Sequence, residues 1–151
     1  MKILDLVDDV RSGCKSVLTT MTLEEYKKLS FFAFNNNGNI DGQRSVIKRS
    51  STAAKIRKRM ADDFRKGAIF PQVVLGVLFS TENMQNLDES KFYMLLESVN
   101  EGQISIIDGM QRSNIYFENY EDNKQQKIRV DKVDRAAIGD LIPLQYQFGK
   151  V

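Results

Sequence analysis

The segment "ISIIDGMQRSNIYF" (residues 104–117) places an acid, a glycine, an amide and an arginine within five positions. An apolar run typical of a buried strand ends at Asp108, Gly109 permits a sharp turn, and a helix is expected to begin near 111–113. Amide groups at a helix start and the planar guanidinium of Arg112 both favour a phosphate group. The pattern therefore predicts a phosphate site in which Asp108 holds magnesium, orients a water molecule or accepts a hydrogen bond from a ribose hydroxyl group. The alternative is a plain strand-to-helix turn that Asp108 caps.

The residue types that are missing restrict the chemistry that this chain can perform. The sequence has no histidine and a single cysteine, Cys14. A Ser-His-Asp triad, a Cys-His pair and a zinc site of histidine or thiolate ligands are therefore excluded. Carboxylates, arginine, lysine, backbone amides and a hard ion such as Mg²⁺ remain. The lone cysteine also suggests a reducing compartment.

A basic segment precedes this motif. Between Arg44 and Lys66 there are nine basic residues against Asp62 and Asp63, so the segment carries +7 and the rest of the chain −5. Such an asymmetry favours a polyanion-binding surface, and the alternative is a solvated helix face. The candidate DNA-binding residues are Arg44, Lys48, Arg49, Lys55, Arg57, Lys58 and Arg59.

Sequence periodicity predicts the elements that position these residues. Thr22 and Glu25 have the spacing of a capping box, with Met21 and Tyr26 as a hydrophobic staple, and predict a helix over Leu23–Phe32. A second helix is expected over Ala53–Lys66, with a buried stripe of Ile56, Met60 and Phe64 and a C-terminal stop at Gly67. Residues 1–18 are compatible with a short helix or a helix-to-strand entry.

The second half of the chain reads as strands and short helices. Strands are expected after Pro71, at 102–107, at 127–133 and at 142–151, and helices at 91–99 and 113–120. The segment 80–90 reads as a polar loop. An earlier echo of the motif, "IDGQR" at 40–44, is expected to form a tight turn because no buried strand precedes it.

Length and composition fit one soluble domain over residues 1–151. The chain is 42% hydrophobic and 28% charged, and no apolar run reaches the roughly 18 residues that cross a bilayer. The acidic N-terminal segment lacks a signal-peptide core. We expect a cytoplasmic protein without a membrane partner. The abrupt end in a strand suggests the N-terminal portion of a longer protein.

The motif and its setting resemble the DGQHR/DGQQR group of ParB-like proteins, which includes DndB-type regulators of DNA phosphorothioation. The resemblance covers roughly Arg44 to Tyr120 and rests on the basic helix, the Pro-led strand "FPQVVLGVLF" and "ISIIDGMQRSNIY". It implies an α+β fold with a ParB/sulfiredoxin-like core, in which a small mixed sheet is flanked by helices. It also implies a nucleotide bound by its phosphates at the junction.

The matching positions are Asp108, Gly109, Gln111 and Arg112, whereas Met110 replaces a usual glutamine and Ser113 a usual apolar residue. The resemblance implies phosphate contacts from Asp108, Gly109, Gln111, Arg112 and Ser113, with Asp108 and Arg112 as candidate catalytic residues. Because methionine cannot supply the hydrogen bonds of glutamine, binding is favoured over catalysis.

Three functions remain open at this point. The first is a nucleotide-responsive DNA-binding regulator of DNA modification or phage defence. The second is an enzyme that hydrolyses a nucleoside triphosphate with Mg²⁺, or a subunit of a modification-dependent restriction system. The third is a non-catalytic protein-interaction module. Homo-oligomers and partner subunits of a modification system are both compatible with the sequence.

Overall fold

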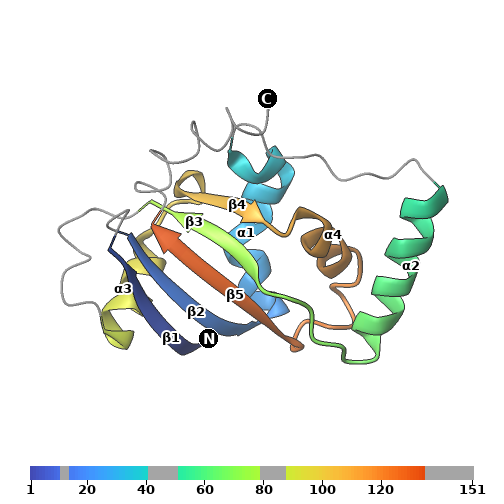
Figure 1. Cartoon of the computed structure of the whole chain (residues 1–151), viewed down its shortest axis with the longest axis horizontal. Coiled ribbons are helices and arrows are strands. Elements are labelled where there is room, and N and C mark those ends of the chain that lie inside the picture. The colour runs from blue at the N-terminus through green and yellow to red at the C-terminus, as the bar shows by residue number, and fades with distance from the viewer. Residues whose placement is uncertain (11–13, 41–50, 79–87, 135–151) are drawn as a thin grey trace.

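The structure, a computed structural model, describes residues 1–10, 14–40, 51–78 and 88–134. Its centre is a five-stranded mixed sheet in the order β1-β2-β5-β3-β4 (Figure 1). β5 pairs antiparallel with β2 and parallel with β3, and the remaining neighbours are antiparallel. The strands are β1 (Lys2–Asp9), β2 (Cys14–Thr22), β3 (Val73–Val77), β4 (Ile104–Asp108) and β5 (Lys127–Asp134).

Four α-helices accompany the sheet within the described residues. They are α1 (Leu23–Asn35), α2 (Ser51–Arg65), α3 (Glu89–Ser98) and α4 (Met110–Glu118), and the short 3-10 helices are η1 (Asn37–Asn39) and η3 (Glu101–Gln103). Figure 1 shows α1 and α3 behind the sheet, with α4 beside it and α2 outermost. The expected α+β class, with a small mixed sheet and flanking helices, is confirmed.

The first 22 residues correct the expectation of a helix near the N-terminus. β1 and β2 pair antiparallel, Lys2–Asp9 with Cys14–Thr20, with a register shift between Ile3 and Asp5. Ile3 and Leu6, on either side of this shift, are partly buried against the core, whereas Leu4 and Val7 are exposed. Pairing of β2 with β5 decides that a strand forms here, because it gives the segment long-range backbone partners that local periodicity cannot reveal.

Helix α1 begins where the capping residues predict. The Thr22 side chain accepts a hydrogen bond from the amide of Glu25, and the Glu25 carboxylate accepts one from the amide of Thr22. Met21 and Tyr26, the expected staple, are both buried. The helix continues three residues past the predicted Phe32 and ends at Asn35.

Helix α2 covers nearly the predicted range, but one of its expected core residues is on the surface. Phe64 is buried and Met60 is partly buried, whereas Ile56 is 55% exposed. The buried residue of α2, Phe64, therefore lies in its C-terminal half. Gly67 ends the helix region with a φ of 91°, in the left-handed region that favours glycine.

The predicted strands at 127–133 and after Pro71 and the helices at 91–99 and 113–120 are confirmed. The strand predicted at 102–107 is also present, but Gly102 and Gln103 belong to η3 and β4 begins at Ile104. Helix α4 begins at Met110, slightly before the expected start. Most of the turn at 40–44, the strand at 142–151 and most of the predicted loop at 80–90 lie outside the described residues. The last two residues of that predicted loop, Glu89 and Ser90, are instead the start of α3. The core combines the buried sides of β2, β3, β4 and β5 with Tyr26, Phe64, Phe92 and Tyr116 from the helices.

Candidate functional site

The junction between β4 and α4 requires glycine at position 109. Gly109 is the N-cap residue of α4 and has a φ of 114°. A Cβ atom there would lie 2.9 Å from both Cγ atoms of Val73 on the neighbouring strand. The close approach of β3 and the left-handed backbone each exclude an ordinary side chain. The turn is thereby held tightly against the end of the sheet.

Two hydrogen bonds hold the guanidinium group of Arg112 next to this turn. Its Nη2 donates to the backbone oxygen of Gln72 at 3.1 Å and to Oδ2 of Asp108 at 3.2 Å. The side chain is 19% exposed. Its Nε is buried and has no hydrogen-bond partner among the described residues. A buried N–H group that lacks a partner costs free energy.

The exposed side chains at the junction are those of Asp108 and Gln111. The Asp108 side chain is 69% exposed although it pairs with Arg112, and Gln111 is exposed. The first amide groups of an α-helix have no partner within the helix. Together, these groups offer donors for an anion with a carboxylate close by, an arrangement suited to a phosphate with an associated cation.

Two residues of the motif point inward. Met110 is 7% exposed and belongs to the hydrophobic core, so the position that departs from the family pattern faces the protein interior. The Ser113 hydroxyl lies 2.6 Å from the Tyr26 hydroxyl, and the Ser113 amide donates to the oxygen of Gly109 at 2.8 Å. Both polar groups of Ser113 therefore already have partners within the fold.

The candidate DNA-binding residues of α2 differ in how exposed their side chains are. Lys55, Lys58 and Arg59 are exposed, and their spacing of three and four residues places them on one helix face. Arg57 is half-buried. The candidates Arg44, Lys48 and Arg49 lie outside the described residues. Three exposed basic side chains thus share one face of α2, which is the outermost helix in Figure 1.

Aromatic contacts join α2 to the helix that begins at the junction. The ring of Phe64 lies 5.0 Å from that of Tyr116 in α4, and Phe70 lies 5.9 Å from each of them. Arg65 adds a hydrogen bond to Asn119 just past the end of α4. Tyr116 is one helical turn after Arg112, so the basic helix and the junction share a single supporting helix.

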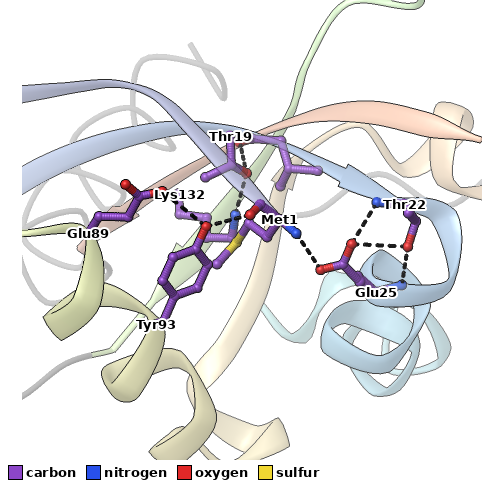
Figure 2. Close-up of polar contacts among 8 residues, drawn as sticks. Met1, Thr19, Thr22, Glu25, Glu89, Tyr93 and Lys132 are labelled. Atoms are coloured by element: carbon purple, nitrogen blue, oxygen red, sulfur yellow. Dashed lines mark hydrogen bonds and ion pairs between the residues drawn. The ribbon is translucent and has the colours of Figure 1, made fainter.

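One buried cation was not predicted from the sequence. Lys132 of β5 is 1% exposed, and its Nζ donates to the Thr19 hydroxyl at 2.6 Å (Figure 2). Burial lowers the pKa of Lys132 from 10.5 to about 7, although the charges of Asp131 and Glu25 act in the opposite direction. Its position in the alternation of β5, after the buried Ile128 and Val130, is the signal that could have revealed it.

No protein-family model, curated protein or solved structure matches this chain. In the part of the chain that the structure describes, no group of three or more His, Cys, Asp or Glu side chains is arranged to hold a metal ion. No helix among the described residues is both long and apolar enough to span a membrane.

Proposed function

We propose that this chain is a nucleotide-responsive DNA-binding protein of the DGQHR-type, ParB-like group, with a ParB/sulfiredoxin-like core. Its role would be the regulation of DNA modification or phage defence in the cytoplasm. The observation that carries the proposal is Arg112, whose guanidinium is held beside the first turn of α4 by Asp108 and the backbone oxygen of Gln72.

The phosphates of a nucleoside triphosphate would bind above Gly109. The amides at the start of α4 supply donors, and the positive end of the helix favours the negative charge. Arg112 is already oriented by Asp108 and the oxygen of Gln72, so little side-chain freedom is lost on binding. Asp108 would face the Mg²⁺ ion that accompanies the triphosphate. Ser113, whose hydroxyl bonds to Tyr26, would position the helix rather than contact the phosphate.

Duplex DNA would bind along the exposed face formed by Lys55, Lys58 and Arg59. These side chains have i, i+3 and i+4 spacing, and no ion pair to them is present among the described residues. Lysine and arginine contacts to phosphates release counterions and give affinity that falls with salt. Because α2 packs on α4 through Phe64 and Tyr116, a nucleotide that orders the start of α4 would also influence the basic helix.

Nucleotide binding is tested by calorimetric titration of the protein with ATP, CTP or GTP in the presence of Mg²⁺. The variant Arg112→Met should weaken binding by about tenfold or more, the cost of a charge-assisted hydrogen bond to phosphate. Arg129→Met is the matched control, since Arg129 is an exposed arginine on β5. Equal affinity of both variants would remove Arg112 from the site, and absence of binding to the unmodified chain would favour an interaction module.

DNA binding is tested by fluorescence anisotropy of a labelled duplex at several salt concentrations. The double variant Lys55→Gln/Lys58→Gln should reduce the log–log salt slope by about two. The control Lys2→Gln/Lys91→Gln removes the same charge from β1 and α3, and should leave the slope unchanged. A duplex affinity that does not vary with salt would contradict the DNA-binding part of the proposal.

Hydrolysis is a second candidate because the Asp108 carboxylate stays exposed beside Arg112. In that case Asp108 would organise Mg²⁺ or the attacking water, and Arg112 would stabilise charge on the transferred phosphate. Phosphate release should then be lost in Asp108→Asn while nucleotide affinity persists. Release at an unchanged rate in this variant would exclude the role, and no release by the original chain would leave binding alone.

A further inference from the structure

A cavity of about 440 Å³ lies between α1 and α3, away from both the junction and α2. Met21 of β2 and Ile104 of β4 contribute to it from the sheet, and η3 also contributes lining residues. Figure 1 shows α3 and α2 at opposite ends of the molecule. This cavity therefore belongs to neither of the surfaces assigned above, and its proposed role does not depend on them.

The interior of the cavity is apolar. Met21 and Ile104 are almost fully buried, and Leu29, Leu96 and Val99 are partly buried around them. The volume lies in the range of roughly 300–1,000 Å³ that is usual for sites that enclose small molecules. An apolar body of the size of a phenyl ring with a short chain would replace water against these side chains.

The charged groups around the cavity are mainly acidic. Glu97 and Glu101 line it and are exposed, and neither makes an ion pair within the described residues. Lys28 is the opposing cation. Glu25 is already neutralised, because its Oε2 accepts a hydrogen bond from the amino group of Met1 at 2.7 Å (Figure 2). Apart from the Met1–Glu25 pair, the cavity is therefore lined by two carboxylates, Glu97 and Glu101, and one ammonium group, that of Lys28.

Hydrogen bonds fix the wall beside these carboxylates. The Tyr93 hydroxyl of α3 donates to the backbone oxygen of Met1, and this contact ties α3 to the start of β1 (Figure 2). The Met1–Glu25 pair then continues to α1 through the capping box. Since α1 and α3 are linked in this way through the N-terminal residue, the cavity is a built feature of the fold.

We propose that this cavity binds a small organic cation, an amine with an apolar aliphatic or aromatic body. The apolar body lies on Met21 and Ile104, and the ammonium group lies at the exposed carboxylates that line the cavity, Glu97 and Glu101. The size of the cavity fits a free small molecule, whereas a docked helix of a partner protein would need a longer apolar groove.

The proposal is tested with three probes of equal apolar part: phenethylamine, phenethyl alcohol and hydrocinnamate. Binding is followed by amide chemical shifts in NMR titrations of the full chain. Phenethylamine should bind about three- to tenfold more tightly than phenethyl alcohol, because partly exposed ion pairs contribute free energy of this order. The difference in affinity between phenethylamine and hydrocinnamate should be larger. The preference should shrink with added salt. The shifts should concentrate on α1, α3 and η3.

Two variants separate the charge from the cavity. Glu97→Gln/Glu101→Gln should abolish the preference for the amine while binding of the alcohol persists, and Leu96→Trp, which fills the cavity, should weaken all three probes. Asp63→Asn on α2 is the charge control and should change nothing. Denaturation midpoints verify that each variant folds.

Equal binding of amine and alcohol, an unchanged preference in the double variant, or shifts elsewhere in the chain would overturn the proposal. So would the absence of binding by any probe. Because Arg112 is unaltered in every variant, nucleotide affinity should remain constant throughout, and failure here is distinguishable from failure of the phosphate site.

Discussion

Gly109 and Val73 lie in such close contact that a single additional carbon atom at position 109 would meet the valine side chain at 2.9 Å. The contact joins the end of β4 to the neighbouring strand β3, and it fixes where α4 begins. The position of Arg112, one turn into that helix, depends on it. Steric exclusion at Gly109 is therefore the foundation of the proposed phosphate site.

Gly109→Ala should destabilise the protein by about 2–4 kcal/mol, because backbone strain and a steric clash add together. Gly67→Ala provides the comparison: Gly67 also has a positive φ, 91°, but nothing lies within 4 Å of its added Cβ. It should cost only the strain, about 1–2 kcal/mol. The excess at Gly109 should shrink in a Val73→Ala background, which removes the two Cγ atoms at 2.9 Å but keeps the Cβ atom at 3.2 Å. Urea denaturation measures all four variants, and an equal cost at both glycines would refute the clash.

Lys132→Met should stabilise the protein at low pH. The folded-state pKa of about 7 lies below the unfolded value of 10.5, so the unfolded chain binds more protons between these values. The contribution of Lys132 to stability therefore rises with pH across this window, and below about pH 7 the burial penalty is present in full. The expected gain is on the order of 4 kcal/mol near pH 6 and should vanish above about pH 10.5. Denaturation across this range checks it, and a gain that does not vary with pH would contradict it.

Glu25→Gln should destabilise the protein at neutral pH and have little effect in acid. Burial tends to raise the pKa of Glu25, but hydrogen bonds and charge from the Met1 amino group and from Thr22 outweigh this and lower it. A carboxyl whose folded pKa is depressed contributes stability above its unfolded pKa of 4.5 and loses it as the pH falls. Thermal unfolding at several pH values tests this. If the difference in stability between the original protein and Glu25→Gln stays the same at every pH, the capping contacts do not depend on the charge of Glu25.

Phe64→Ala should cost about 3–5 kcal/mol, because it removes a buried ring between Phe70 and Tyr116. Amide exchange in α2 should accelerate, since Phe64 is the one fully buried residue of that helix. Ile56→Ala is the control: its side chain is 55% exposed, and the change should stay within about 0.5 kcal/mol. Comparable losses for both variants would mean that the N-terminal half of α2 is also packed.

Tyr26 and Ser113 should be strongly coupled. Their hydroxyl groups are buried and 2.6 Å apart, and burial raises the pKa of Tyr26 to about 12. Either Tyr26→Phe or Ser113→Ala removes a partner of the other hydroxyl and should cost about 1–3 kcal/mol. The double variant should cost clearly less than the sum of the two. An additive double-mutant cycle would show that the hydroxyl contact contributes nothing.

Local features of the sequence were sufficient to place most elements. The capping residues Thr22 and Glu25 located the start of α1, and Gly67 located the end of α2. The apolar run before Asp108 and the Asp-Gly pair located the junction between β4 and α4. These signals depend on hydrogen bonds and dihedral angles within a few residues, so they can be read from the chain itself.

Tertiary structure decided which side chains are available. Pairing with β5 made residues 14–22 a strand, and the packing of α2 buried Phe64 but left Ile56 exposed. Contacts with other elements turned Met110 and Ser113 inward and left Asp108 and Gln111 accessible. Burial of Lys132 and the cavity between α1 and α3 also arise from segments far apart in the chain. The sequence by itself determined where a turn and a helix must form. The assembly of the sheet and its helices determined which of their groups a ligand can reach, because burial depends on neighbours that local patterns do not specify.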